Sequence, residues 1–127
     1  MEGLLLGYAA FARGYTVLIS GGPADRARAA ALAARCPAAC AVRAIAGEVD
    51  IPALAAVLAN AAAAVCVNTG VMHLAALLDV PVIGLHGPTS RRRWGPLGAQ
   101  AVALAPPQGT RCEFLNLGFE YPDSPAE

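Results

Sequence analysis

The sequence contains no lysine, and only a small part of it is charged. Its nine basic residues are all Arg, nine acidic residues balance them, and charged residues make up 14% of the 127 residues. A protein that binds duplex DNA or an anionic membrane through its charge carries a clear excess of basic side chains. The composition therefore argues against a mainly electrostatic partner, and we expect no binding to nucleic acid.

Long apolar runs are also lacking, although 57% of the residues are hydrophobic. No run approaches the roughly 20 residues that span a bilayer. The apolar stretch 4–12 follows the acidic Glu2, where a secretory signal would carry Lys or Arg. We therefore interpret this stretch as the end of a helix that packs on a sheet. We expect a cytoplasmic protein, with peripheral association at the inner membrane only through a longer full-length protein.

The four cysteines lack the C-x-x-C spacing of a zinc site and the density of a secreted disulfide scaffold. They are Cys36, Cys40, Cys66 and Cys112. Free thiols fit this pattern better, and Cys66 lies in an apolar run where a thiol acts as a small hydrophobe.

What the sequence does contain is an alternation of short β-branched runs with Ala- and Leu-rich stretches, which is typical of βα units around a parallel sheet. We expect strands at about 16–20, 41–45, 63–67, 80–85 and 101–104, and helices at about 25–35, after Asp50, and at 71–78. The spacing of Ile51, Leu54 and Leu58 predicts one helical face. The predicted fold is an α/β, Rossmann-like parallel sheet with helices on both faces over residues 1–105. An irregular tail rich in Pro and Gly is expected over 106–127.

In a sheet of this kind, ligands bind beyond the carboxyl ends of the strands, where the strand-to-helix loops meet. The loops that qualify are 20–25, 68–73 and 86–89. In the second loop, Gly70 lets a ligand approach the backbone at the start of a helix, where unpaired amides and the helix dipole favour a phosphate. Thr69 would supply a hydroxyl donor or cap the helix, and His73 lies one turn further on.

Each of these features also has a structural interpretation. Any βα junction needs a capping residue and often a Gly, which accounts for residues 68–70. A single His on an Ala- and Leu-rich helix is commonly a packed side chain, and Asp25 is an ordinary residue of a first helical turn. The run Arg91–Arg93 is usually a solvated face, although it could neutralise a diphosphate or approach an anionic acceptor.

Taken together, three segments resemble the C-terminal domain of glycosyltransferase family 9, which includes the ADP-heptose:lipopolysaccharide heptosyltransferases of bacteria. The segments are Val67–Ala76, with Asn-Thr-Gly-Val-Met-His at its centre, then Val80–Thr89, which ends in Gly-Pro-Thr, and then Trp94-Gly95-Pro96. The resemblance extends upstream through Leu18–Pro23 and covers about residues 5–104, and residues 116–122 look like the tail of some members.

The resemblance implies a GT-B enzyme, which has two Rossmann-like domains. It also implies that the C-terminal domain binds the nucleotide sugar. It implies a donor such as ADP-heptose, a glycan or lipid acceptor such as the lipopolysaccharide core, and no metal or cofactor. The residues that it places in the donor site are Asn68, Thr69, Gly70, Val71, Met72, His73, Gly22, Asp25, Gly87, Pro88 and Thr89.

The chain departs from the family pattern at Asn68, where the family has an acidic residue, and this change removes a charge while keeping a group that can orient the loop. We also expect the N-terminal GT-B domain, with its general base and a Lys near the donor phosphates, to lie outside this chain. No catalytic residue is therefore expected in this chain, and we predict negligible turnover by it alone. The alternatives are a non-catalytic nucleotide-binding module and, less well matched to the Gly-Pro-Thr spacing, a sugar epimerase with a GT-B-like fold.

Overall fold

The computed structural model describes residues 13–87 and 89–106, and these form two compact units, Met1–Ile51 and Pro52–Glu127. Each unit is described by itself. The expected segment 4–12, residue Pro88, Cys112 and the tail beyond residue 106 lie outside the described residues.

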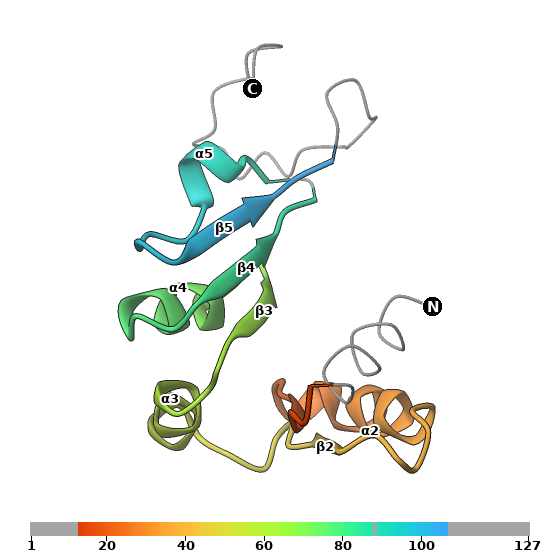
Figure 1. Ribbon diagram of the computed structural model, residues 1–127. Coiled ribbons are helices and arrows are strands. Elements are labelled where there is room, and N and C mark those ends of the chain that lie inside the picture. Colours follow the sequence, from red (N-terminus) through yellow and green to blue (C-terminus); the bar gives the residue numbers. More distant parts are fainter. Residues whose placement is uncertain (1–12, 88, 107–127) are drawn as a thin grey trace. The chain divides into compact units, whose positions relative to one another are not determined.

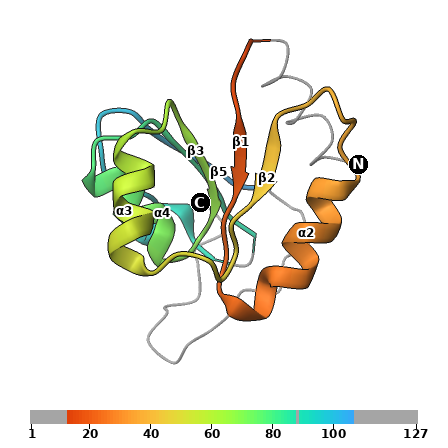
Figure 2. The same ribbon diagram turned by 90° about the horizontal axis from the view of Figure 1, so that it is seen from below.

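The first unit contains two parallel strands and a helix. The strands β1 (Val17–Ile19) and β2 (Val42–Ala44) pair in the register Val17 to Val42. Between them lie the short 3-10 helix η1 (Pro23–Asp25) and the helix α2 (Arg26–Ala34), which packs against β2 (Figure 2). The order of strand, helix and strand agrees with the sequence prediction, with each strand one residue shorter at both ends.

The second unit is built on a parallel sheet in the order β3-β4-β5 (Figure 1). The strands are β3 (Ala64–Val67), β4 (Val82–Leu85) and β5 (Ala101–Leu104), and the helices are α3 (Ile51–Ala59), α4 (Gly70–Leu77) and α5 (Arg91–Trp94). The fold class predicted from the sequence, an α/β arrangement of parallel strands and helices, is confirmed.

Small side chains let α4 lie close to the sheet. Met72 and Ala75 of α4 are fully buried, and α4 contacts both β3 and β4. A Cβ atom on Gly84 of β4 would lie only 2.7 Å from the Met72 sulfur. Glycine at this position therefore allows the helix and the strand to approach each other.

The opposite face of the same sheet carries large aliphatic side chains that are exposed. The outward residues of the three strands are Val65, Val67, Ile83, Leu85, Val102 and Leu104. In α3, Leu54 and Leu58 are buried as predicted, whereas Ile51 is 64% exposed because it stands at the first residue of the helix. The three residues stand in one helix at the predicted spacing, and only Leu54 and Leu58 are buried.

Candidate functional site

The loops that follow β3 and β4 lie side by side at the carboxyl edge of the second sheet. The parallel register pairs Val67 with Leu85, so Asn68 and His86 are the first residues beyond two paired strand ends. The Asn68 side chain donates a hydrogen bond from Nδ2 to the Thr89 hydroxyl oxygen over 2.8 Å. The structure thus brings together two of the loops that the sequence analysis selected.

The turn into α4 is open at its glycine. Gly70 is the first residue of the helix, it is exposed, and a Cβ atom built on it would meet no atom within 4 Å. The amides of Gly70 and Val71, the first two residues of the helix, have no partner within the helix, and they are aligned with the positive end of its dipole. Apart from the neighbouring residues Thr69 and Val71 and the backbone of the helix itself, no described residue has an atom within 4 Å of that Cβ position, and we call it the space in front of Gly70.

Thr69 does not cap α4 with its side chain. Its backbone is extended, and its hydroxyl lies 3.3 Å from the Val67 carbonyl, to which it donates. The backbone carbonyl of Thr69 accepts the amide of Met72 at 3.0 Å. The hydroxyl proton of Thr69 is therefore already used, and the backbone amides remain the groups of this turn that can meet an anion.

The two residues predicted to follow in the donor site have different surroundings. Met72 has no exposed surface and packs near Gly84, so its side chain belongs to the core. The prediction that Met72 contacts the donor does not agree with this burial, and we leave it out of the proposed contacts. Val71 and His73 are both half-buried on the first turns of α4.

The loop after β4 is anchored by His86, which the sequence analysis did not select as a site residue. His86 is 5% exposed, and its amide donates to the Leu104 carbonyl of β5 over 2.7 Å. Its Nδ1 lies 3.3 Å from the Thr89 hydroxyl, and its buried Nε2 has no hydrogen-bond partner among the described residues. A polar residue directly after an apolar strand, in a loop next to the loop of Asn68, was the signal that could have identified it.

Burial is the largest influence on the His86 ring and lowers its pKa. A backbone hydrogen bond with Thr89 acts in the opposite direction, and the charges of His73 and Arg91 lower the pKa further. The ring is therefore held in its neutral form at neutral pH. Gly87, beside it, is exposed, with open space where a Cβ would be.

Hydrogen bonds within the protein hold the loop that follows β1 in the first unit. The Asp25 carboxylate accepts the amide of Gly22 over 3.0 Å, and a Cβ on Gly21 would lie 2.8 Å from the Asp25 Cβ. Arg26 donates to the Gly47 carbonyl over 2.7 Å and fixes the same loop to the segment after β2. These bonds give Asp25 a structural role within its loop, and a contact of Gly22 or Asp25 with a donor remains a prediction.

The arginine run forms the short helix α5, which the sequence analysis left unassigned. Ser90 caps it by accepting the amide of Arg93 at 3.4 Å, and Arg93 lies over the Trp94 ring at 5.7 Å. A Cβ on Gly95 would collide with the Arg91 carbonyl oxygen. The Trp-Gly-Pro segment is therefore explained by the tight exit from α5, and the three arginines are exposed.

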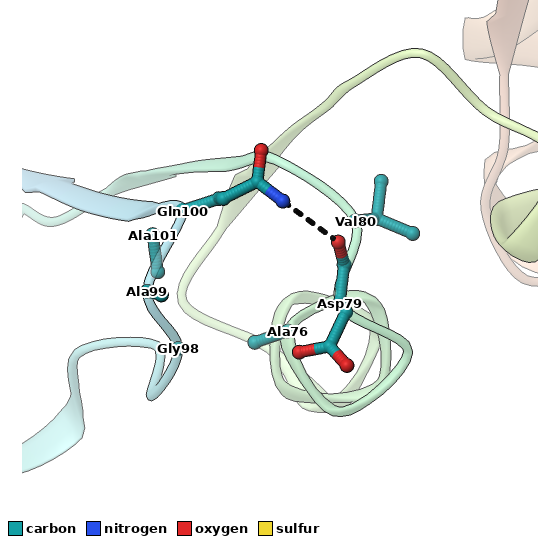
Figure 3. A pocket seen from close by; sticks show the side chains of 7 residues that line it. All are labelled: Ala76, Asp79, Val80, Gly98, Ala99, Gln100 and Ala101. Atoms are coloured by element: carbon teal, nitrogen blue, oxygen red, sulfur yellow. Dashed lines mark hydrogen bonds between the residues drawn. The ribbon is translucent and has the colours of Figure 1, made fainter.

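A pocket lies at the other edge of the same sheet, where β4 and β5 begin (Figure 3). Its lining is Ala76, Asp79, Val80, Gly98, Ala99, Gln100 and Ala101. The one hydrogen bond drawn across it runs from the Gln100 amide nitrogen to the Asp79 carbonyl over 3.5 Å. Because this edge carries the amino ends of the strands, the pocket is separate from the loops described above.

The part of the chain that the structure describes shows neither a cluster for a metal ion nor a helix that could span a membrane. Residues 13–87 and 89–106 hold no group of three or more His, Cys, Asp or Glu side chains placed to bind a metal ion. Within the same ranges, no helix has the length and apolar character needed to cross a membrane.

Comparison with known sequences gives a consistent result. A sequence profile of glycosyltransferase family 9 (heptosyltransferase) matches residues 6–114. Lipopolysaccharide heptosyltransferase 1 of Pseudomonas aeruginosa is 42% identical over 93 residues, which are 72% of this chain and 25% of that protein. Lipooligosaccharide heptosyltransferase 2 of Haemophilus influenzae is 35% identical over 60 residues, 47% of this chain and 17% of that protein. The chain thus spans a quarter or less of the relatives it matches.

Solved structures show the same relationship. Escherichia coli heptosyltransferase WaaC with ADP superposes with a TM-score of 0.72 at 30% identity, over 83% of this chain and 32% of that one. The E. coli ADP-heptose heptosyltransferase II gives a TM-score of 0.68 at 26% identity, over 85% and 34% of the two chains. A family 9 glycosyltransferase of Veillonella parvula shares the fold, with a TM-score of 0.73 at 22% identity over 80% and 29%.

Proposed function

Because the chain belongs to glycosyltransferase family 9, we propose that it is the donor-binding part of a heptosyltransferase and that it binds the diphosphate of a nucleotide sugar at the turn into α4. The observation that carries this proposal is the open space in front of Gly70. A diphosphate is an acceptor of hydrogen bonds only, and the amides of Gly70 and Val71 at the start of α4 are donors without partners in the helix.

The chemistry proposed for the whole enzyme is inverting sugar transfer. The acceptor hydroxyl attacks the anomeric carbon of the sugar, the bond from that carbon to the nucleoside diphosphate breaks, and the diphosphate leaves with the bonding electron pair. Backbone amides and the dipole of α4 would stabilise the negative charge that develops on the leaving group. No charged side chain of the loops after β3 and β4 opposes that charge, since residue 68 is Asn.

The general base and the acceptor site are not among the residues proposed here. We infer that an N-terminal domain of a longer protein supplies both of them. That domain would bind a glycan or lipid acceptor such as the lipopolysaccharide core. A second candidate function, a nucleotide-binding module without catalysis, rests on the same turn and on the small fraction of its relatives that the chain covers. Transfer by a longer protein that contains this segment separates the two.

Calorimetric titration with ADP tests the proposed site. We expect the chain to bind ADP, and we expect adenosine without phosphate to bind at least about tenfold more weakly, since a lost hydrogen bond to a charged group costs about 1.5–3 kcal/mol. Gly70→Ala should weaken ADP binding about tenfold, because it keeps the amide but places a methyl group in the space that the diphosphate would occupy. Gln100→Ala, in the pocket at the opposite edge of the sheet, is the matched control and should leave ADP affinity unchanged. Loss of affinity in the control but not in Gly70→Ala would move the site to that pocket.

A further inference from the structure

The loops after β3 and β4 are joined through a single hydroxyl. The Thr89 oxygen accepts a hydrogen bond from Asn68 Nδ2 at 2.8 Å and lies 3.3 Å from His86 Nδ1. A hydroxyl has two lone pairs and one proton. The protonation of the His86 ring therefore decides whether the Thr89 proton is used inside the protein or is left for another group.

The burial of His86 favours one assignment of its proton. A buried ring is disfavoured in its charged form, so it carries one proton, on Nδ1 or on Nε2. Nε2 is buried and has no partner among the described residues. A buried N–H without an acceptor is rarer in proteins than a buried acceptor without a donor. The proton therefore belongs on Nδ1, the ring nitrogen that faces Thr89. From there it is donated to the Thr89 hydroxyl oxygen at 3.3 Å, and the backbone hydrogen bond between the ring and Thr89, which raises the pKa, favours a proton on the same side.

With this assignment both lone pairs of the Thr89 oxygen are occupied, by Asn68 and by His86. The hydroxyl proton can then be donated only to a third group that accepts a hydrogen bond. Thr69 does not offer such a proton, because its hydroxyl donates to the Val67 carbonyl.

We propose that Asn68 and His86 are positioning residues that hold the Thr89 hydroxyl as a hydrogen-bond donor to a phosphate oxygen of the nucleotide. The identity of the ligand in this inference rests on the proposed function. The direction of the hydrogen bonds at Thr89 rests only on the protons of the His86 ring and of the Thr89 hydroxyl. This arrangement explains what an uncharged Asn contributes at residue 68: a carboxylate there would accept the Thr89 proton and remove it from the ligand.

The first test uses the chain without ligand. Long-range proton–nitrogen NMR correlations of the His86 ring report which nitrogen carries the proton, and we expect Nδ1 to be protonated and Nε2 to be bare. A proton on Nε2 overturns the inference, since Thr89 would then donate to Nδ1. This outcome does not depend on nucleotide binding, so it separates the inference from the proposed function.

The second test measures ADP affinity in a matched pair of variants. His86→Leu removes the donor to Thr89, and we expect about tenfold weaker ADP binding. His86→Asn keeps an amide N–H near the position of Nδ1, and it should restore most of that loss. Equal losses in both variants, or no loss in His86→Leu while the chain itself binds ADP, would overturn the positioning role.

Discussion

At the scale of single residues, the same residue type has two different roles in the second unit. Gly84 and Gly70 lie in neighbouring elements, but a Cβ on Gly84 would meet the Met72 sulfur at 2.7 Å, whereas a Cβ on Gly70 would meet nothing within 4 Å. The first glycine is required by packing and the second is required only if something else approaches the backbone. Substitution by Ala separates the two roles.

We predict that Gly84→Ala lowers the melting temperature, because overpacking a filled contact costs about 1–3 kcal/mol. Gly70→Ala should leave the melting temperature within about one degree or raise it slightly, since Ala is a better helix residue than Gly. Thermal unfolding followed by circular dichroism measures both. A marked fall in the melting temperature of Gly70→Ala would show that the space in front of Gly70 is filled in solution.

Met72 gives a prediction about the core. Its side chain has no exposed surface, so Met72→Ala leaves a cavity and should reduce the free energy of unfolding by about 2–5 kcal/mol. Urea denaturation measures this change, and the exposed Leu77 on the same helix provides the control, with a change of less than about 0.5 kcal/mol expected for Leu77→Ala. Equal effects of the two substitutions would contradict the packing described for α4.

At the scale of elements, the sequence predicts the strands better than the junctions. Runs such as 63–67 and 101–104 are apolar and bounded by breakers, so their positions are predictable within a residue or two. The short helix α5 was not predicted, because three consecutive arginines resemble a solvated loop and only the cap at Ser90 marks a helix start. The buried state of Met72 was also not predicted, because the family pattern places it in a loop motif while its helical position turns it to the sheet.

The contact between Asn68 and Thr89 could not be read from the sequence, since it depends on the register of β3 and β4. Adjacency of the two loops was predictable from the parallel topology alone. The hydrogen-bond partners of the individual side chains required coordinates.

The strand β3 carries the Cys66 thiol, and the titration of this thiol tests how it is buried. Burial raises the pKa of the Cys66 thiol, so the folded state favours the protonated form. The stabilisation is complete below the ordinary thiol pKa of 9.0 and is lost as the pH rises from there through the raised pKa of the folded state. We therefore predict that the chain loses stability relative to Cys66→Ala as the pH rises from about 8 to about 10, as measured by urea denaturation at each pH. Parallel pH profiles for the two proteins would contradict the burial of this thiol.

At the scale of the whole molecule, binding of the nucleotide sugar and turnover are separate properties. The chain covers about a quarter of the P. aeruginosa relative, and the groups proposed here act only on the leaving diphosphate. We predict that the purified chain, incubated with ADP-heptose and a lipopolysaccharide core acceptor, releases no ADP above the rate without protein, because we propose that the general base and the acceptor site belong to another domain of a longer protein. ADP release that depends on the acceptor would contradict this prediction, and a longer protein that contains the same segment is the positive control.

The most direct test of the central claim is a titration of the isotope-labelled chain with ADP, followed through its backbone amide resonances. We predict that the amides of Gly70 and Val71 show the largest saturable shifts, with smaller shifts at residues 86–89. If the amides of Gly70 and Val71 do not move at millimolar ADP, or if the shifts gather at residues 98–101, a diphosphate does not bind at the start of α4.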